Sequence, residues 1–159
     1  MNPIEECYAS AVGTYIDTIE GVEQGSSLSH FYCTGFIDRT FIDESGRTFT
    51  CKAMNMDVGQ PKDDNSAFQN MILQLDNNFG EVQEIVEAAR ERGNRFIVTA
   101  RRYLVADLTA PAVVYRSTLL SREYEEGIAK LTCGFFDLLN TNGLRGVLTT
   151  DRAPGLTYT

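Results

Sequence analysis

The sequence has little of what metal and cofactor sites require. Its 159 residues include no tryptophan, one histidine, four prolines and four cysteines. Structural zinc sites use cysteines and histidines at short spacing, but Cys7, Cys33, Cys51 and Cys133 form no C-x-x-C unit and lie in separate segments. We therefore expect free, largely buried thiols and neither a cofactor nor a metal, although sequence alone leaves open a metal held by cysteines from distant segments.

Basic charge is scarce as well. Fourteen Lys and Arg residues stand against 22 Asp and Glu residues, which gives a formal net charge of −8. Such a surface repels phosphate backbones and anionic lipids, so we expect no binding of nucleic acid or membrane. The sequence contains no apolar run of ~18 residues, and acids occupy the N-terminus where a signal peptide carries basic residues. We expect a protein that is cytosolic when it is synthesised.

The residues that are present predict a folded, mainly β domain. Hydrophobic residues make up 43% of the chain, with nine Phe and seven Tyr, which is typical of a globular protein. We expect one core domain over residues 1–137 and an irregular C-terminal arm over residues 138–159. An N-terminal helix is predicted from Asn2 and Pro3 to about Gly13. β-Branched and aromatic residues predict strands over 14–22, 30–42, 47–57, 68–76, 95–107, 112–123 and 127–137.

One segment has a clear helical period. Apolar residues recur at three- and four-residue steps within 78–92, while glutamates fill the opposite face. The predicted core stripe consists of Phe79, Val82, Ile85, Val86 and Ala89. Asn77 or Asn78 is the expected N-terminal cap and Gly93 the C-terminal one. The predicted fold class is therefore α+β: a mostly antiparallel sandwich or barrel with one substantial helix.

Motifs of catalysis are weak. The sequence has no G-x-S-x-G turn and no glycine-rich phosphate loop. A nucleophilic Cys33 paired with His30 is conceivable, but a strand cysteine is more often a small core residue. Arg101 and Arg102 form the densest basic spot, yet neighbours on a strand face opposite sides, so we expect one solvated arginine and one paired with an acid. We predict no catalytic residues.

The C-terminal third carries the most specific signal. The run Asp137 to Asn140 ends the last predicted strand, Arg145 follows, and Pro154, Gly155 and Leu156 stand near the end. In these residues the chain resembles a family of small minor tail proteins of long-tailed phages, long catalogued as of unknown function. Leu138, Leu139 and Thr149 also match, whereas Gly143 and Leu144 stand where that family has Phe-Pro, and Leu148 where it has Tyr.

The resemblance implies a non-enzymatic part of a phage tail, present in the virion and in the host cytoplasm during assembly. It implies a sandwich or barrel of the tail-tube or distal-tail type, which joins or forms a ring, most often hexameric, between the tail tube and the tip or hub complex (the baseplate). Its partners would be further copies, the tail tube protein and the tip or hub protein, with the tape-measure protein as a further candidate, and DNA would pass without specific binding. The residues expected at its interfaces are Asp137, Asn140, Arg145, Pro154, Gly155 and Leu156. A monomeric assembly chaperone or binding module is the alternative, and an enzyme the third.

Overall fold

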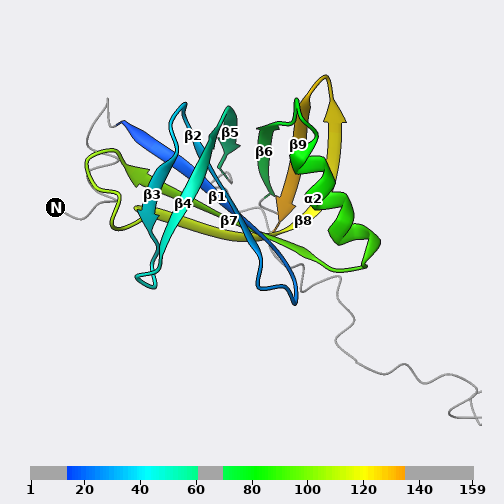
Figure 1. The fold of residues 1–159 in the computed structure, drawn as a ribbon, viewed down its shortest axis with the longest axis horizontal. Helices are drawn as coiled ribbons and strands as arrows, with labels where there is room; N and C mark the ends of the chain where they lie inside the picture. Colours follow the sequence, from blue (N-terminus) through cyan, green and yellow to red (C-terminus); the bar gives the residue numbers. More distant parts are fainter. Residues whose placement is uncertain (1–13, 61–69, 135–159) are drawn as a thin grey trace, which may run out of the picture.

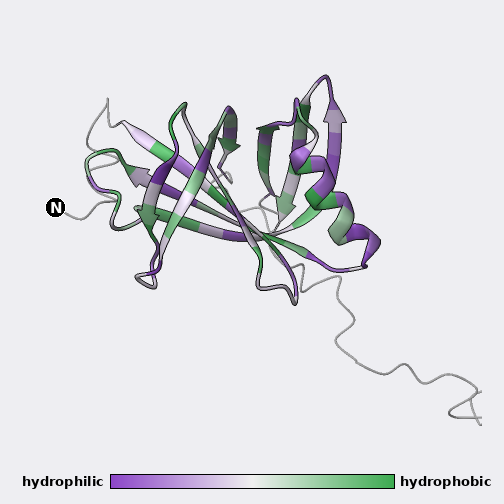
Figure 2. Ribbon diagram, viewed as in Figure 1, coloured by the Kyte–Doolittle hydropathy of each residue, from purple (hydrophilic) through white to green (hydrophobic). Residues whose placement is uncertain are grey.

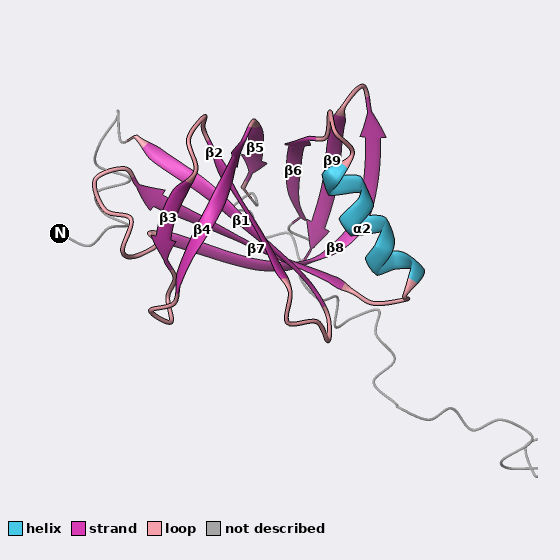
Figure 3. Ribbon diagram, viewed as in Figure 1, coloured by secondary structure: helices cyan, strands magenta, loops and turns pink. Residues whose placement is uncertain are grey.

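The structure, a computed structural model, describes residues 14–60 and 70–134. Within them the chain forms strands and a single helix (Figures 1 and 3), as the predicted mainly β, α+β class requires. The elements are β1 (Tyr15–Glu23), β2 (Ser29–Thr34), β3 (Arg39–Ile42), β4 (Thr48–Met54), β5 (Met56–Gly59), β6 (Asn70–Asp76), α2 (Glu81–Glu91), β7 (Phe96–Leu104), β8 (Val113–Glu125) and β9 (Ile128–Gly134).

All nine of these strands belong to one sheet, in the order β3-β4-β2-β1-β7-β8-β9-β6-β5. Neighbouring strands are antiparallel except β2 and β4, which are parallel. The expected antiparallel arrangement of the segments that became β7, β8 and β9 is confirmed. The longest-range pairing joins β1 to β7, with Tyr15 opposite Leu104 and Glu23 opposite Phe96.

The two ends of this sheet are connected by the chain itself. β4 pairs with β2, and after the single residue Asn55 the chain continues as β5, which pairs with β6 at the other end. The carbonyl of Asn55 also accepts a hydrogen bond from the backbone N–H of Asp76 (3.0 Å). The sheet therefore curls into a barrel-like shape although its strand order is open (Figure 1).

Opposite faces of the sheet bury two apolar clusters. The larger lies between α2 and the strands β1, β5, β6, β7 and β9, and includes Leu73, Val86, Val98 and Leu131. The smaller lies on the other face of β1, β2 and β7, beneath the β3–β4 hairpin, and includes Phe41, Cys51 and Tyr103. Alternation along the strands produces this division, because successive side chains point to opposite faces. Burial alternates in this way along β6 and β9, and Figure 2 shows apolar and polar residues interspersed along the strands.

Helix α2 confirms most of the predicted stripe and corrects one member. Val82, Val86 and Ala89 are buried, but Phe79 precedes the helix and is fully exposed (100%), so its assignment to the core was wrong. The apolar period in the sequence starts at Phe79, but Gly80 has φ +71° and α2 begins only at Glu81. The N-cap residue is Gly80, so the predicted cap at Asn77 or Asn78 was wrong, although Oδ1 of Asn77 accepts the backbone N–H of Gln83 in the first turn (3.1 Å).

The helix end follows its prediction. The backbone N–H of Gly93, at φ +71°, donates to the carbonyl of Arg90 (2.8 Å), and that of Asn94 donates to the carbonyl of Ala89 (3.1 Å). This pair of bonds is a Schellman motif, in which glycine takes the left-handed conformation without steric cost.

Two predicted strands are interrupted. The hairpin turn at 43–46 is confirmed, but the run 30–42 breaks at residues 35–38, where Gly35 takes φ +137°, and the run 47–57 breaks at Asn55. The predicted helix before Gly13 and the arm over 138–159 lie outside the described residues. The interruption at residues 35–38 forms the exposed β2–β3 loop.

Candidate functional site

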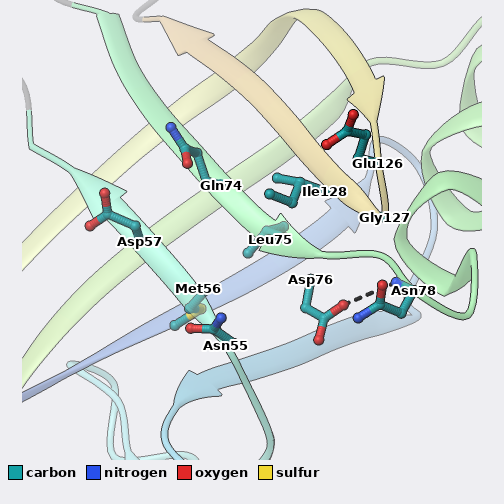
Figure 4. Close-up of a pocket in the computed structure, with 10 residues that line it drawn as sticks. All are labelled: Asn55, Met56, Asp57, Gln74, Leu75, Asp76, Asn78, Glu126, Gly127 and Ile128. Atoms are coloured by element: carbon teal, nitrogen blue, oxygen red, sulfur yellow. Dashed lines mark hydrogen bonds between the residues drawn. The ribbon is translucent and has the colours of Figure 1, made fainter.

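A polar pocket of about 220 Å³ opens where three connections meet (Figure 4). Asn55 forms the β4–β5 bend and Asp57 follows it in β5, Asp76 ends β6 and Asn78 lies between β6 and α2, and Glu126 comes from the β8–β9 turn. The sequence offered no spacing signal for this pocket, because its residues are brought together only by the sheet order.

Backbone hydrogen bonds hold the walls of the pocket in place. The N–H of Asn77 donates to the carbonyl of Gly127 (2.7 Å), and the N–H of Asn78 donates to Oδ1 of Asp76 (3.0 Å). Glu126 and Gly127 form the tight turn of the β8–β9 hairpin at φ +46° and φ +80°. A Cβ atom on Gly127 would lie 2.3 Å from Oδ1 of Asn78, so glycine is required there by space as well as by conformation.

The ionisable groups that line this pocket are all carboxylates. Its lining carries Asp57, Asp76 and Glu126, and none of the ten lining residues is a Lys, Arg, His, Cys, Ser or Thr. The acidic wall repels phosphate and other anions. Across the described residues, no group of three or more His, Cys, Asp or Glu side chains is arranged to hold a metal ion.

A second polar cluster is buried on the opposite face of the sheet. The guanidinium of Arg101, whose side chain is 4% exposed, donates to Glu20 (2.8 Å) and to both carboxylate oxygens of Glu44 (2.7 and 3.1 Å). Arg47 donates to Glu20 (2.8 Å) and to Asp43 (2.9 Å). This cluster of five residues, the buried ion network, fastens the β3–β4 turn to β1 and β7.

The electrostatics of the network are those of a structural clamp. Burial alone would raise the pKa of Glu20, but hydrogen bonds from Arg47 and Arg101 outweigh it and leave the pKa below its ordinary value. Hydrogen bonds from Ser45 and Arg47 likewise overcome burial and lower the pKa of Asp43. Within the described part of the chain, no buried side-chain polar atom lacks a hydrogen-bond partner. The network therefore has no unused donor aimed at a ligand.

Two adjacent apolar side chains are exposed on the β2–β3 loop. Phe36 is fully exposed (103%) and Ile37 is 69% exposed. The base of this loop is fixed, because Oδ1 of Asp38 accepts the backbone N–H of Ala53 (2.8 Å) and the N–H of Gly35 contacts the carbonyl of Met54 (3.4 Å). We call the Phe36–Ile37 pair the knob.

The comparison with protein families identifies the family to which this chain belongs. Residues 4–146 match the family described as Domain of unknown function (DUF1833). The chain belongs to the DUF1833 family. No curated protein matches it. The match includes every described residue and extends into the C-terminal segment that carries the tail-protein resemblance.

The six interface residues predicted for this DUF1833 chain lie outside the described residues: Asp137, Asn140, Arg145, Pro154, Gly155 and Leu156. Sequence reasoning missed the knob, because Phe36 and Ile37 sit within a run of strand-forming residues. The available signal was Gly35 on one side and Asp38 on the other, since both residue types are typical of turns.

The cysteine and arginine predictions are tested directly. Cys33, Cys51 and Cys133 are buried and free, as expected, whereas Cys7 is not among the described residues. Cys33 lies three positions after His30 on β2, an odd offset, so the two side chains face opposite sides of the sheet. His30 borders the α2 side, and Cys33 belongs to the smaller cluster. This geometry separates the conceivable catalytic pair.

Arg101 and Arg102 do face opposite sides, but the expectation that one of them is solvated was wrong. Arg101 lies in the buried ion network, and Arg102 forms two hydrogen bonds with Asp17 (2.7 and 2.9 Å). The guanidinium of Arg102 also lies 3.8 Å from the ring centroid of Tyr15. Both arginines therefore belong to the sheet and neither forms a basic patch for nucleic acid. No helix in the described ranges is long and apolar enough to cross a membrane.

Proposed function

We propose that this protein is a structural component of a phage tail, which forms or joins a ring at the distal end and connects the tail tube to the tip or hub complex. The observation that carries the proposal is the C-terminal motif shared with minor tail proteins, in which an Asp-Leu-Leu-Asn run at 137–140 is followed by Arg145 and by Pro-Gly-Leu at 154–156. The family match spans the first part of this motif, to residue 146.

The architecture supports a role in assembly. A curled sheet gives a rigid body whose polar groups are satisfied internally, while the knob leaves apolar area free for a partner. Subunits of a ring use such surfaces, because a head-to-tail contact between copies closes into a ring when the rotation permits it. The net charge of −8 suits a channel for DNA, since it repels phosphate.

The described residues offer less support for an enzyme. The lining of the polar pocket has no hydroxyl, thiol, imidazole or amine group, and His30 and Cys33 face opposite sides of β2. The exposed knob also favours the second candidate, a monomeric chaperone that binds a tail component and leaves before the particle is complete. The two candidates differ in whether the protein forms a ring and whether it stays in the virion.

The deciding experiment measures the mass of the purified chain by light scattering at several concentrations, with negative-stain images of the same sample. A multimer of several subunits around a central hole supports the tail-ring proposal. A monomer that is present in purified particles indicates assembly on a partner, and a monomer absent from them indicates the chaperone. If the protein is found neither as a ring nor in purified particles, the tail-component proposal is contradicted.

The C-terminal segment gives a second test of the same proposal. Deletion of residues 141–159 should leave the described sheet folded, because its nine strands and the pairings between them all lie between residues 15 and 134. The same deletion should abolish assembly. Circular dichroism measures the first outcome and incorporation into particles the second, and a truncated chain that still enters particles contradicts the role given to the arm.

A further inference from the structure

A groove on the far side of the molecule matches the knob in character. It runs between α2 and the β1–β2 loop and has a volume of about 250 Å³. Its apolar lining comes from three elements: the loop contributes Leu28, α2 contributes Ile85 and Ala88, and β7 contributes Phe96. The rest of the lining is polar or charged and consists of Glu23, Ser26, His30, Glu84 and Arg92. We call this feature the α2 groove.

The α2 groove is open to an apolar side chain. Leu28 at its lip is 64% exposed. Two charged residues at its rim neutralise each other, because Glu23 pairs with Arg92 (2.5 Å), and Glu23 also accepts a hydrogen bond from Asn94 (2.7 Å). The carboxylate of Glu84 is the remaining charge in the lining, and an incoming apolar side chain would lie beside it.

The dimensions of the groove suit an aromatic ring. Apolar cavities of about 150 Å³ bind benzene, so about 250 Å³ accommodates the phenyl ring of Phe36 together with part of Ile37. A smaller apolar cavity lies directly beneath the groove and shares His30, Ile85 and Phe96 with it. The groove is thus continuous with the space under the helix, and a ring in it would rest on the main apolar cluster.

Knob and groove lie too far apart to meet within one chain. The β2–β3 loop lies at the upper left of Figure 1, whereas α2 lies at the right. A contact between the two features therefore joins different copies. It is heterologous, since one copy offers the knob and the next offers the groove, and contacts of that kind generate rings.

We propose that the Phe36–Ile37 knob of one copy inserts into the α2 groove of a second copy, and that this contact is a subunit interface of the ring. The inference rests on the proposed function, because it names the partner surface of that ring. Two adjacent exposed apolar residues on a fixed loop serve as the anchor, and the aromatic and aliphatic lining of the groove is the complementary pocket. A single contact of this kind binds weakly, but each copy in a closed ring makes two of them, so the assembled ring is held more tightly than a pair of copies.

The test uses the full chain and two pairs of matched variants. Phe36→Ser removes the ring from the knob, and Phe79→Ser is its control, because Phe79 is equally exposed and lies outside both surfaces. Ala88→Glu places a charge in the groove, and Gln83→Glu adds the same charge to an exposed position of α2 outside the groove. Thermal unfolding verifies that all four variants fold.

Sedimentation velocity then measures the concentration at which half the chains are assembled. We expect Phe36→Ser and Ala88→Glu to raise this concentration by roughly 30-fold or more, which is the effect of losing an interface hot spot. The two controls should assemble like the unaltered chain. A mixture of Phe36→Ser and Ala88→Glu retains one intact knob and one intact groove, so native mass spectrometry should detect mixed dimers and no larger species.

Three results would overturn the inference. The first is a ring that forms equally well with Phe36→Ser and Ala88→Glu, which would remove this contact and leave the proposed ring intact. The second is a mixture of the two variants that assembles into full rings. The third is an unaltered chain that remains monomeric at the highest attainable concentration. That third result would still leave a role in the tail open, since presence in purified particles is measured separately.

Discussion

Replacing Arg101 with methionine tests whether the buried ion network holds the β3–β4 hairpin on the sheet. The substitution keeps an extended apolar stem but removes the cation that pairs with Glu20 and Glu44. Glu20 is 8% exposed and keeps only its contact with Arg47, while Glu44 is half exposed and can turn to water. Breaking a buried ion pair from one side costs about 3–5 kcal/mol, and the remaining Arg47 contact places the expected loss near the lower end, about 3 kcal/mol.

The assay is urea and thermal unfolding followed by circular dichroism. For a chain of this length, about 3 kcal/mol corresponds to a fall in Tm of roughly 6–12 °C. The matched control is Arg90→Met, because Arg90 pairs with Glu87 but its side chain is 67% exposed, so the expected loss is below about 0.5 kcal/mol. Arg101→Met combined with Glu20→Gln should lose less than the sum of the single changes, because no buried carboxylate is left partly paired. A loss for Arg101→Met no larger than that of the control would refute this account.

Three other predictions concern pH, backbone geometry and thiol reactivity. The pKa of Glu20 in the folded protein lies below its unfolded value, so its charged form stabilises the fold above about pH 4.5. This contribution is lost as the pH falls through the folded pKa. Glu20→Gln should therefore make the free energy of unfolding decline less steeply when the protein is titrated with acid. Gly127→Ala should lose more stability than Gly25→Ala, since both glycines have positive φ but only the first Cβ meets Asn78; equal losses would contradict the steric argument. Burial raises the pKa of the Cys133 thiol to about 12, so brief alkylation at pH 8 followed by peptide mapping should leave it unmodified until the chain is unfolded.

Much of the fold could be predicted from local sequence patterns. The apolar period of 82–89, the glycine at 93 and the turn at 43–46 predicted a helix and a hairpin that the structure contains, because each depends on residues close in sequence. The errors lie where tertiary contacts compete with propensity. Phe79 continues a helical period but precedes the helix, and Asn55 interrupts a strand so that its two halves can pair with β2 and with β6.

The candidate site was less accessible to sequence reasoning. Glu20, Glu44 and Arg101 come from three separated segments, and only the β1–β7 pairing and the β3–β4 turn bring them within hydrogen-bond distance. The polar pocket and the α2 groove likewise depend on connections between elements far apart in the chain. An alternation pattern tells which face of a strand a side chain takes, but the identity of the opposing element comes from the sheet order.

The pairing of β1 with β7 has a consequence for how the protein is made. Synthesis proceeds from the N-terminus at about 5–20 residues per second, so the ribosome adds the roughly 80 residues from the end of β1 to the end of β7 over about 4–16 s. During that interval one edge of β1 has no native strand to pair with, and Glu20 has no Arg101. The β1–β2 hairpin can form early, but the sheet acquires its centre only when β7 emerges, which makes the nascent chain most vulnerable to aggregation before residue 104 has left the exit tunnel.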